Sequence, residues 1–353
     1  MEHSQEFMKR FDLLKEQPYA VKCSAIQILN ENLEAAHSFN RPMQMSSLNV
    51  LYYRFRANFD GLQSTHEPKP PVGLDQSGRA AYEQGKRVIN VRESENKLEI
   101  EYDDIVANVP GRTKADVVIV ADGPNSYMRG LLQPDLQHQY AGYVAWRGMV
   151  PEENVTRQTR TLLENKTTLL STANGYIALY IIPGENGALE KGKRLFNFVC
   201  MSHRRTLPIG KMQSSVWAQQ RASARDILPA QLCDLIDQTT EPFISSISDI
   251  GISRPSFHEG KLLFVGDALV QFRPHVACST NQAALDALLV GRLMKGEISL
   301  STWEREVLDY AHLTRLRSIT WGDWYQVGYG AFFFSKARHL LAVAWQSARN
   351  FFQ

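Results

Sequence analysis

The sequence of 353 residues has few cysteines and almost no excess of charge of either sign. Its four cysteines, Cys23, Cys200, Cys233 and Cys278, form no C-x-x-C pair and no spacing that is typical of metal ligands. This argues against a metal site and indicates a reduced compartment, the cytoplasm. The formal net charge of +2, from 39 basic and 37 acidic residues, gives no electrostatic case for a nucleic-acid partner.

Uninterrupted apolar runs are also missing. The first residues, MEHSQEFMKRF, have no apolar core of the kind found in signal peptides. The C-terminal stretch AFFFSKARHLLAVAWQSARNFFQ is apolar, but Lys336, Arg338, His339 and Arg349 interrupt it. No integral membrane span is therefore expected. An amphipathic helix packed on the body of the protein is favoured over contact with a membrane surface.

Periodicity and turn residues predict a mixed α/β fold. Residues 47–62 show helical spacing closed by Gly61, and 86–104 alternate on both sides of 94–96, which is typical of a β-hairpin. Residues 114–132 predict a strand, a turn and a helix. Residues 139–201 predict an antiparallel sheet, and 217–239 a helix. Helices are expected from about 278 to the C-terminus.

The stretch LLFVGDALVQFRPHVACSTNQAALDALLVG, residues 262–291, predicts a ligand site. A buried strand ends at Gly266-Asp267, and ligands bind beyond the carboxyl ends of strands in α/β sheets. Asp267 can accept a hydrogen bond from a sugar or ribityl hydroxyl. The helix that begins near Thr280 and Asn281 offers free N–H groups to an electron-rich group. The equally weighted alternative is a turn-forming Asp and an ordinary helix cap.

A second stretch, VVIVADGPNSYMR, repeats this layout and favours the ligand interpretation. An apolar run is followed by Asp122-Gly123, a short turn and Arg129. Gly123 allows a positive φ and a close approach of the backbone to a ligand. Arg129 could pair with a phosphate or with Asp122. Two such motifs, about 145 positions apart, fit one large ligand.

The two motifs, ADGPNSYMR and GDALVQFRPHVACSTNQAALDA, together resemble the DG and GD motifs of single-component FAD-dependent aromatic hydroxylases. With YAGYVAWRG and the RPH spacing, the sequence is most similar to the dihydroxypyridine hydroxylase branch and to fungal salicylate-hydroxylase-like relatives. The resemblance runs from about 41 to 309. It implies a discontinuous, Rossmann-like FAD-binding domain over 1–135 and 250–325. It further implies an inserted antiparallel-sheet substrate domain over 136–249 and a helical tail over 326–353.

The resemblance assigns roles residue by residue. The residues that it places at FAD are Arg56, Asp122, Gly123, Arg129, Asp267, Cys278, Ser279, Thr280 and Asn281. Pro274 is placed near the reactive edge of the flavin. Arg54 rivals Arg56, which could instead be an exposed helix arginine. Where the family usually has glycines after the proline, this chain has Cys278 and Ser279.

One expected element of the family is missing. No G-x-G-x-x-G occurs anywhere in the sequence, so the unit that holds the FAD pyrophosphate is expected to be absent, leaving the domain incomplete at its N-terminus. Three explanations stay open: a gene model that starts late, a divergent protein that binds FAD poorly, and a flavin-free pseudoenzyme. The last would act as a binding protein or a non-oxidative enzyme.

The activity implied is hydroxylation of a small phenolic or heteroaromatic molecule with NAD(P)H and oxygen. Such a reaction needs a group that helps to ionise the substrate. Candidates on the predicted sheet are Arg147 and Tyr180, with Tyr143 and Tyr176, and a packed structural role is the alternative for each. His275 is interpreted as structural. No resident metal is expected, and a homodimer and a role in secondary metabolism are left open.

Overall fold

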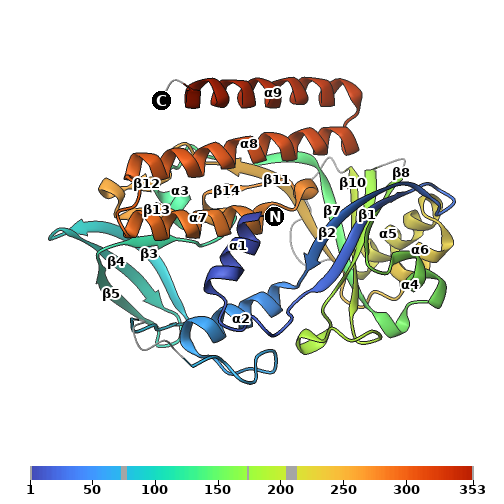
Figure 1. Cartoon of the computed structure of the whole chain (residues 1–353), viewed down its shortest axis with the longest axis horizontal. Coiled ribbons are helices and arrows are strands. Elements are labelled where there is room, and N and C mark those ends of the chain that lie inside the picture. The colour runs from blue at the N-terminus through green and yellow to red at the C-terminus, as the bar shows by residue number, and fades with distance from the viewer. Residues whose placement is uncertain (1, 73–77, 173–174, 204–212, 352–353) are drawn as a thin grey trace. The chain divides into compact units, whose positions relative to one another are not determined.

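The computed structural model describes residues 2–72, 78–172, 175–203 and 213–351, and its chain packs into two compact units. Unit 1 comprises Met1–Phe11, Ala81–Ala141 and Ser248–Gln353, and unit 2 comprises Asp12–Ala80 and Gly142–Ile247 (Figure 1). These units are defined by packing, whereas the predicted domains are defined by their ligands. The boundaries of the predicted domains therefore stay a prediction.

The central sheet of unit 1 has three short strands in the order β12, β13, β6. They are β12 (Ser256–Phe257), β13 (Leu262–Phe264) and β6 (Val118–Val120). β13 runs parallel to β6, with Phe264 opposite Val120, and antiparallel to β12. All of β13 is fully buried, as its run of apolar residues predicts. A short 3-10 turn at His258–Gly260 joins β12 to β13, and two more follow β13 at Gly266–Ala268 and Pro274–Val276.

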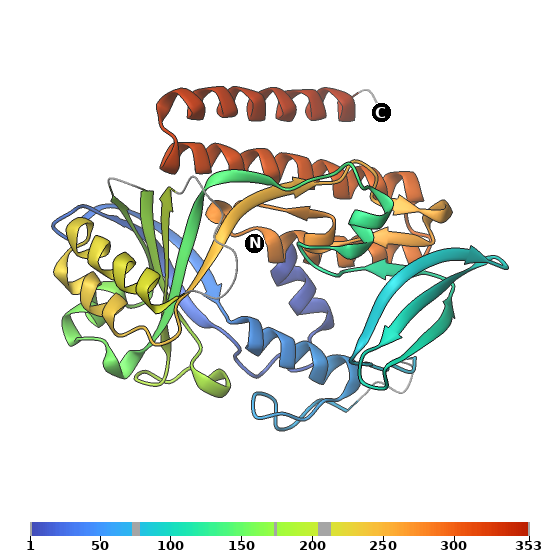
Figure 2. The ribbon, with the colours of Figure 1, turned by 180° about the vertical axis from the view of Figure 1, so that it is seen from behind.

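A second sheet of unit 1 contains the predicted hairpin (Figure 2). Its strands are β3 (Lys86–Ser94), β4 (Lys97–Asp104) and β5 (Val109–Ala115), all antiparallel. The turn residues Glu95 and Asn96 have φ of 50° and 64°. Positive φ at both central residues matches the right-handed twist of the paired strands. The hairpin predicted over 86–104 is confirmed.

Helices complete unit 1. They are α1 (Glu2–Phe11), α3 (Tyr127–Leu132), α7 (Ser279–Met294), α8 (Leu300–Gln326) and α9 (Tyr329–Phe351). The buried β13 packs with Trp303 and Val307 of α8 in one apolar core. The short β14 (Val270–Gln271) pairs with Ile250 and Gly251. The predicted series of C-terminal helices is confirmed.

Unit 2 is built on one mixed sheet, in the order β11, β7, β10, β9, β8, β1, β2. Its strands are β1 (Val21–Leu29), β2 (Ala35–Met45), β7 (Gln139–Pro151), β8 (Lys166–Thr172), β9 (Gly175–Ile182), β10 (Leu195–His203) and β11 (Phe243–Gly251). The chain passes between the two units within β7 and within β11. The strands β7 to β10 are antiparallel neighbours where they pair, as predicted, whereas β1 joins β8 in parallel.

Helices pack on one face of this sheet. They are α4 (Arg157–Leu163), α5 (Ser214–Ile227) and α6 (Ala230–Asp237), and 3-10 turns lie at Glu152–Asn154 and Glu185–Gly187. Trp146 and Phe198 of the sheet share a core with Trp217 and Leu232 of the helices. The single helix predicted over 217–239 is wrong in one respect. Pro229 has no N–H to continue a helix, and it separates α5 from α6.

The helix α2 (Leu48–Asp60) also belongs to unit 2 and follows the prediction closely. The Ser47 side chain accepts a hydrogen bond from the Val50 N–H, which caps the helix start. Gly61 ends the helix with φ of 71°, a left-handed conformation that favours glycine.

Over the residues that the structure describes, no helix has the length and apolarity needed to cross a bilayer. Nor do His, Cys, Asp and Glu side chains gather there in groups of three or more that could hold a metal ion.

Candidate functional site

The two predicted acids follow neighbouring strands of unit 1. Asp122 comes after β6 and Asp267 after β13, and these strands lie side by side in parallel. Their carboxyl ends therefore meet at one edge of the sheet, where ligands of α/β folds bind. Gly123, with φ of 83°, turns the chain after Asp122 into a conformation that other residues rarely adopt. The structure thus brings together two motifs that are far apart in the sequence.

Arg129 ties the two turns to each other. The residue is 3% exposed, and its guanidinium donates to the carbonyl oxygens of Asp267 and Ala268, at 3.2 and 3.0 Å. It also donates to the carbonyl of Pro124, within its own motif. The sequence left open a pairing of Arg129 with a phosphate or with Asp122. The structure places it instead among backbone carbonyls, while Asp122 accepts from the Met128 N–H at 3.2 Å.

A histidine that the sequence did not single out completes this contact. His138 Nε2 lies 3.2 Å from Arg129 Nη2, and its Nδ1 lies 3.3 Å from the Ser248 hydroxyl. Burial and the nearby Arg129 lower the pKa of His138. A neutral ring at this position can accept a hydrogen bond from the guanidinium.

The turn at Gly266 rests on a buried carboxyl of α7. Asp286 Oδ2 accepts the Gly266 N–H at 2.7 Å, and its Oδ1 accepts from Gln282 Nε2 at 2.6 Å. Asp286 and Gln282 are both fully buried. Burial raises the pKa of Asp286 to about 7, against the opposing effect of these two hydrogen bonds. Gly266 has φ of 59°, a left-handed conformation that glycine adopts readily, and this bond holds the turn directly before Asp267.

Asp267 is itself electrostatically unusual. Burial raises the pKa of its carboxyl, while a hydrogen bond from Ser279 and the charge of Arg129 oppose the shift. Ser279 is the first residue of α7. The predicted neighbours Asp267 and Ser279 are therefore brought together, and the carboxyl lies at the start of this helix.

The other residues at the start of α7 differ in what they offer. Cys278 is the N-cap residue, and its side chain makes no capping hydrogen bond, so N–H groups of the first turn are left for another acceptor. The Cys278 Sγ lies 3.0 Å from Arg317 Nη2.

Thr280 is exposed. Asn281 is buried, and its side chain accepts from the Ser4 N–H at 3.1 Å and donates to the Tyr310 hydroxyl at 2.6 Å. Any role for Asn281 at a ligand would be through its backbone.

The Pro274 loop is fixed by a charge cluster that sequence reasoning missed. Asp249, fully buried, accepts from Arg273 Nε at 2.8 Å and from Arg315 Nε at 2.7 Å. Arg273 thereby anchors the backbone just before Pro274. His275 follows, its ring 6.2 Å from that of Tyr325, and burial lowers its pKa to about 3. Each charge stands far from its partners in the sequence, so no local pattern marks the cluster.

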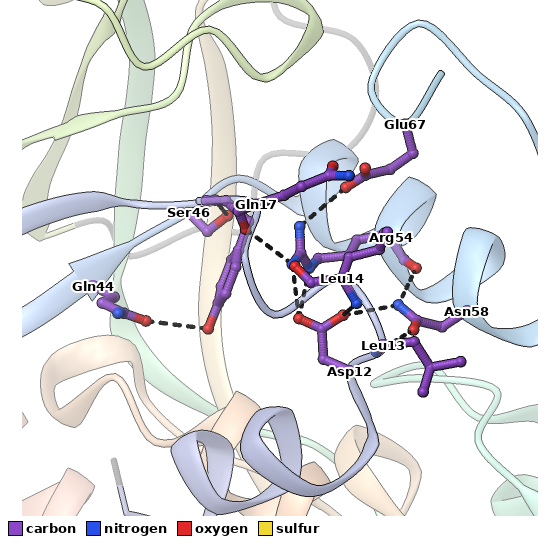
Figure 3. Close-up of polar contacts among 10 residues, drawn as sticks. Asp12, Leu13, Leu14, Gln17, Gln44, Ser46, Arg54, Asn58 and Glu67 are labelled. Atoms are coloured by element: carbon purple, nitrogen blue, oxygen red, sulfur yellow. Dashed lines mark hydrogen bonds and ion pairs between the residues drawn. The ribbon is translucent and has the colours of Figure 1, made fainter. Parts of the chain in front are cut away.

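Unit 2 separates the two arginines of α2. Arg54 is 1% exposed and paired with Asp12 at 2.8 Å and with Glu67 at 3.2 Å (Figure 3). It also donates to the carbonyls of Leu14 and Gln17. Arg56 instead makes an ion pair with Asp60 on its own helix at 2.7 Å. Arg54 is thus committed to the fold, which leaves Arg56 as the candidate for a ligand.

The four candidates on the sheet of unit 2 share one face. Arg147 of β7 lies opposite Val199 of β10, which lies opposite Ala178 of β9, two residues before Tyr180. Because side chains alternate along strands, Tyr143, Arg147, Tyr176 and Tyr180 all project away from the face that carries Trp146. Burial raises the pKa of Tyr180, and the charge of Arg147 opposes this. Tyr143 packs edge-on against His203.

Asn197 on the same face was not anticipated. It pairs with Tyr180 across β10 and β9. Its Nδ2 is buried and has no hydrogen-bond partner among the residues that the structure describes. Buried amide groups are normally satisfied, so an unsatisfied one suits a ligand acceptor. An Asn within the otherwise apolar run 195–201 was the available signal in the sequence.

Comparisons with known proteins match parts of the chain. A family described as "FAD binding domain-like" matches residues 140–203 and 200–249. A curated relative, 2,6-dihydroxypyridine 3-monooxygenase of Paenarthrobacter nicotinovorans, is 25% identical over 256 residues, which are 67% of this chain and 62% of the relative. The matched region thus spans less than two thirds of that relative's length.

Two solved structures show the same fold. That of 2,6-dihydroxypyridine-3-hydroxylase from Arthrobacter nicotinovorans aligns with a TM-score of 0.74 and 19% identity, over 93% of this chain and 82% of that one. Klebsiella pneumoniae HpxO complexed with FAD and uric acid aligns with a TM-score of 0.66 and 16% identity, over 96% and 81%. The predicted α/β fold class and the predicted resemblance to the dihydroxypyridine hydroxylase branch are confirmed.

Proposed function

We propose that this protein is an FAD-dependent monooxygenase that hydroxylates a small phenolic or heteroaromatic molecule with NAD(P)H and oxygen. The observation that supports it most is the joint placement of Asp122 and Asp267 after adjacent parallel strands, with Arg129 bonded into both turns. A curated relative and a solved structure of similar fold are both named for dihydroxypyridine hydroxylation, and another structure of similar fold is complexed with FAD and uric acid.

The chemistry of the donor set in unit 1 fits FAD. The Asp267 carboxylate accepts hydrogen bonds and suits the hydroxyls of the ribityl chain. The N–H groups at the start of α7, a helix of 16 residues, suit the electron-rich pyrimidine end of a flavin ring. Arg56, Thr280 and Gly123 are retained as further contacts. When bound, FAD supplies the redox chemistry and the transfer of oxygen.

The protein's own part is to position and ionise the substrate. In this proposal Tyr180 and Asn197 hold polar groups of the aromatic ring, since both lie on one sheet face. The cationic Arg147 favours the phenolate form of a bound phenol, just as it opposes the raised pKa of Tyr180. Pro274 would border the reactive edge of the flavin. The backbone at this position is fixed by Arg273, which donates a hydrogen bond to Asp249.

The first experiment is an absorption spectrum of the purified chain with added FAD, before and after desalting. A flavin band with shifted maxima that survives desalting supports the proposal. The Asp267→Ala variant should lose the band, whereas Asp135→Ala, which removes an exposed acid of the same unit, should keep it. A chain that retains no FAD, or an Asp267→Ala variant that binds as well as the parent, would contradict it.

Turnover is the second test. Oxidation of NADPH and of NADH is followed with a panel of phenols, hydroxypyridines and related heteroaromatic compounds. If the cation assists ionisation of the substrate, Arg147→Met should change KM little and lower kcat strongly. Tyr180→Phe should mainly raise KM. Product formed without NAD(P)H or oxygen would point to a non-oxidative enzyme, and binding without any product to a binding protein.

The remaining assignments are proposals of the same kind. The partner is a small aromatic compound, the compartment is the cytoplasm, and the candidate oligomer is a homodimer. Light scattering of the full chain measures the oligomeric state, and imaging of a tagged chain in its native cell locates it.

A further inference from the structure

The last helix, α9, presents its more polar side to the protein. Both views show it running along α8 (Figures 1 and 2). Residues on its less exposed side recur every three or four positions: Phe332, Ser335, His339, Ala342, Gln346 and Arg349. Phe332 packs on Trp324 at 4.8 Å between ring centroids, and Arg349 pairs with Asp309 of α8. Four of these six side chains are polar, whereas the buried stripe of a surface helix is normally apolar.

The contact between α8 and α9 is also open. A cavity of about 780 Å³ lies between them, lined by residues that include Arg305, Arg317 and His339. A second, of about 820 Å³, is lined by residues that include His312, Leu341 and Arg349. Apolar packing against α8 therefore does not explain the apolar character of α9.

Five large apolar side chains of α9 are nevertheless more than half exposed. We define the outer face of α9 as Phe333, Phe334, Leu340, Leu341 and Trp345. Phe334 is 67% exposed, and Leu341 and Trp345, which also line the second cavity, are 70% and 72% exposed. Helical spacing puts Lys336 and Arg338 at the two borders of this face. Trp321 and Trp324 of α8 are also partly exposed.

The charge of this region favours one kind of partner. Residues 324–353 contain Lys336, Arg338 and Arg349 but no Asp or Glu. An apolar face rich in Phe, Leu and Trp, bordered by cations, matches helices that lie in the interface of an anionic bilayer. A second copy docked on the same face would bring two acid-free cationic helices together. Charge complementarity therefore favours lipid over self-association.

We propose that the outer face of α9 binds the surface of an anionic lipid bilayer, with the helix lying in the plane of the interface. Phe333, Leu340 and Leu341 enter the acyl boundary, while Lys336 and Arg338 reach the lipid phosphates along the borders. The sequence favoured a helix packed on the body. The structure adds that such packing leaves the apolar face uncovered.

The test is co-flotation of the full chain with vesicles of phosphatidylcholine containing about one third phosphatidylserine, beside vesicles of phosphatidylcholine alone. We expect binding to the anionic vesicles that weakens as salt rises, because surface charge is screened. Lys336→Glu with Arg338→Glu should lower the partition coefficient by a factor of about 30 or more, since each of the two cations lost near an anionic surface contributes about 1 kcal/mol.

A second pair of variants separates docking from folding. Leu340→Asp with Leu341→Asp should abolish flotation, whereas Val106→Asp, which alters an equally exposed apolar residue on the β4–β5 turn, should leave it unchanged. Circular dichroism confirms that both variants are folded. The proposal would be overturned if the parent chain did not float, or if the Leu340→Asp, Leu341→Asp variant floated as well as the parent. It would also be overturned if the parent formed a dimer that this variant lost, and did not bind vesicles.

Discussion

Arg129 donates from Nη1 to the carbonyl oxygen of Asp267 at 3.2 Å, across 138 positions of sequence. With the bonds to Ala268 and Pro124, one buried guanidinium satisfies three backbone carbonyls at the candidate flavin site. The geometry of both aspartate turns depends on this residue.

Arg129→Met should therefore destabilise unit 1 by about 2–4 kcal/mol, because three carbonyls lose a charged donor in a buried place. Urea unfolding measures the change, and FAD retention should fall with it. Arg87→Met removes an exposed arginine of the same unit and should change little. A loss below about 1 kcal/mol in the Arg129 variant would show that the carbonyls find other partners.

Asp286 predicts a pH dependence. Its pKa is raised to about 7, above the ordinary value of 3.8, so the folded state holds a proton that the unfolded state releases. The contribution of Asp286 is fully present below about pH 4 and is lost as pH rises through about 7. Asp286→Asn keeps an acceptor for the Gly266 N–H and cannot ionise.

The free energy of unfolding of the parent, relative to Asp286→Asn, should fall by about 2–4 kcal/mol between pH 4 and pH 8. Urea titrations of both proteins at several pH values measure the difference. A difference that is constant over this range would mean that Asp286 titrates near its ordinary pKa. Asp286→Ala, which removes the acceptor, should be less stable than Asp286→Asn at every pH.

The buried ion pairs of Arg54 with Asp12 and Glu67 predict that a loss of stability can be reversed by further substitutions. Arg54→Met leaves Asp12 and Glu67 buried without their cation and should cost about 3–5 kcal/mol. Adding Asp12→Asn and Glu67→Gln removes both stranded charges, so the triple variant should recover much of the loss. Arg56→Met, on the same helix, should disturb folding far less. A triple variant no more stable than the single one would show that packing, and not charge, dominates.

The backbone conformation of Ala277 predicts that a substitution by glycine stabilises the protein. Its φ of 51° is in the left-handed region, which costs residues with a side chain about 1 kcal/mol relative to glycine. Ala277→Gly should raise the free energy of unfolding by about that amount. Ala287→Gly, at an exposed position within α7, should lower it by about 1 kcal/mol, because glycine weakens helix interiors. Calorimetry of the two variants checks the opposite signs, and equal signs would refute the strain at Ala277.

Local patterns were enough for those features that depend on neighbours in the chain. The hairpin around Glu95 and Asn96 and the capped helix that ends at Gly61 follow from alternation and turn chemistry. Asp122 and Asp267, which follow two apolar runs, were recognisable for the same reason. A buried strand and the turn that ends it are both determined by residues that are neighbours in the sequence.

Other features depend on which distant segments pack together, and no local pattern marks them. Asp249 meets Arg273 and Arg315, and Arg54 meets Asp12, only after the tertiary fold has formed. The sequence likewise marks α9 as amphipathic, but it does not say which side of the helix meets α8. Pro229 could have been recognised as the break between α5 and α6, because a proline inside a helical pattern ends the helix locally.

The pairing of β6 with β13 has a consequence for how the chain acquires its fold. The strand Val118–Val120 leaves the ribosome well over a hundred residues before its parallel partner Leu262–Phe264. Until then its apolar edge has no native neighbour, and closing so long a loop costs entropy before any contact repays it. Unit 2, whose last segment ends at Ile247, is complete before β13 is synthesised. The aspartate pair therefore comes together late in folding, and a nascent chain halted before residue 262 would be a target for chaperones.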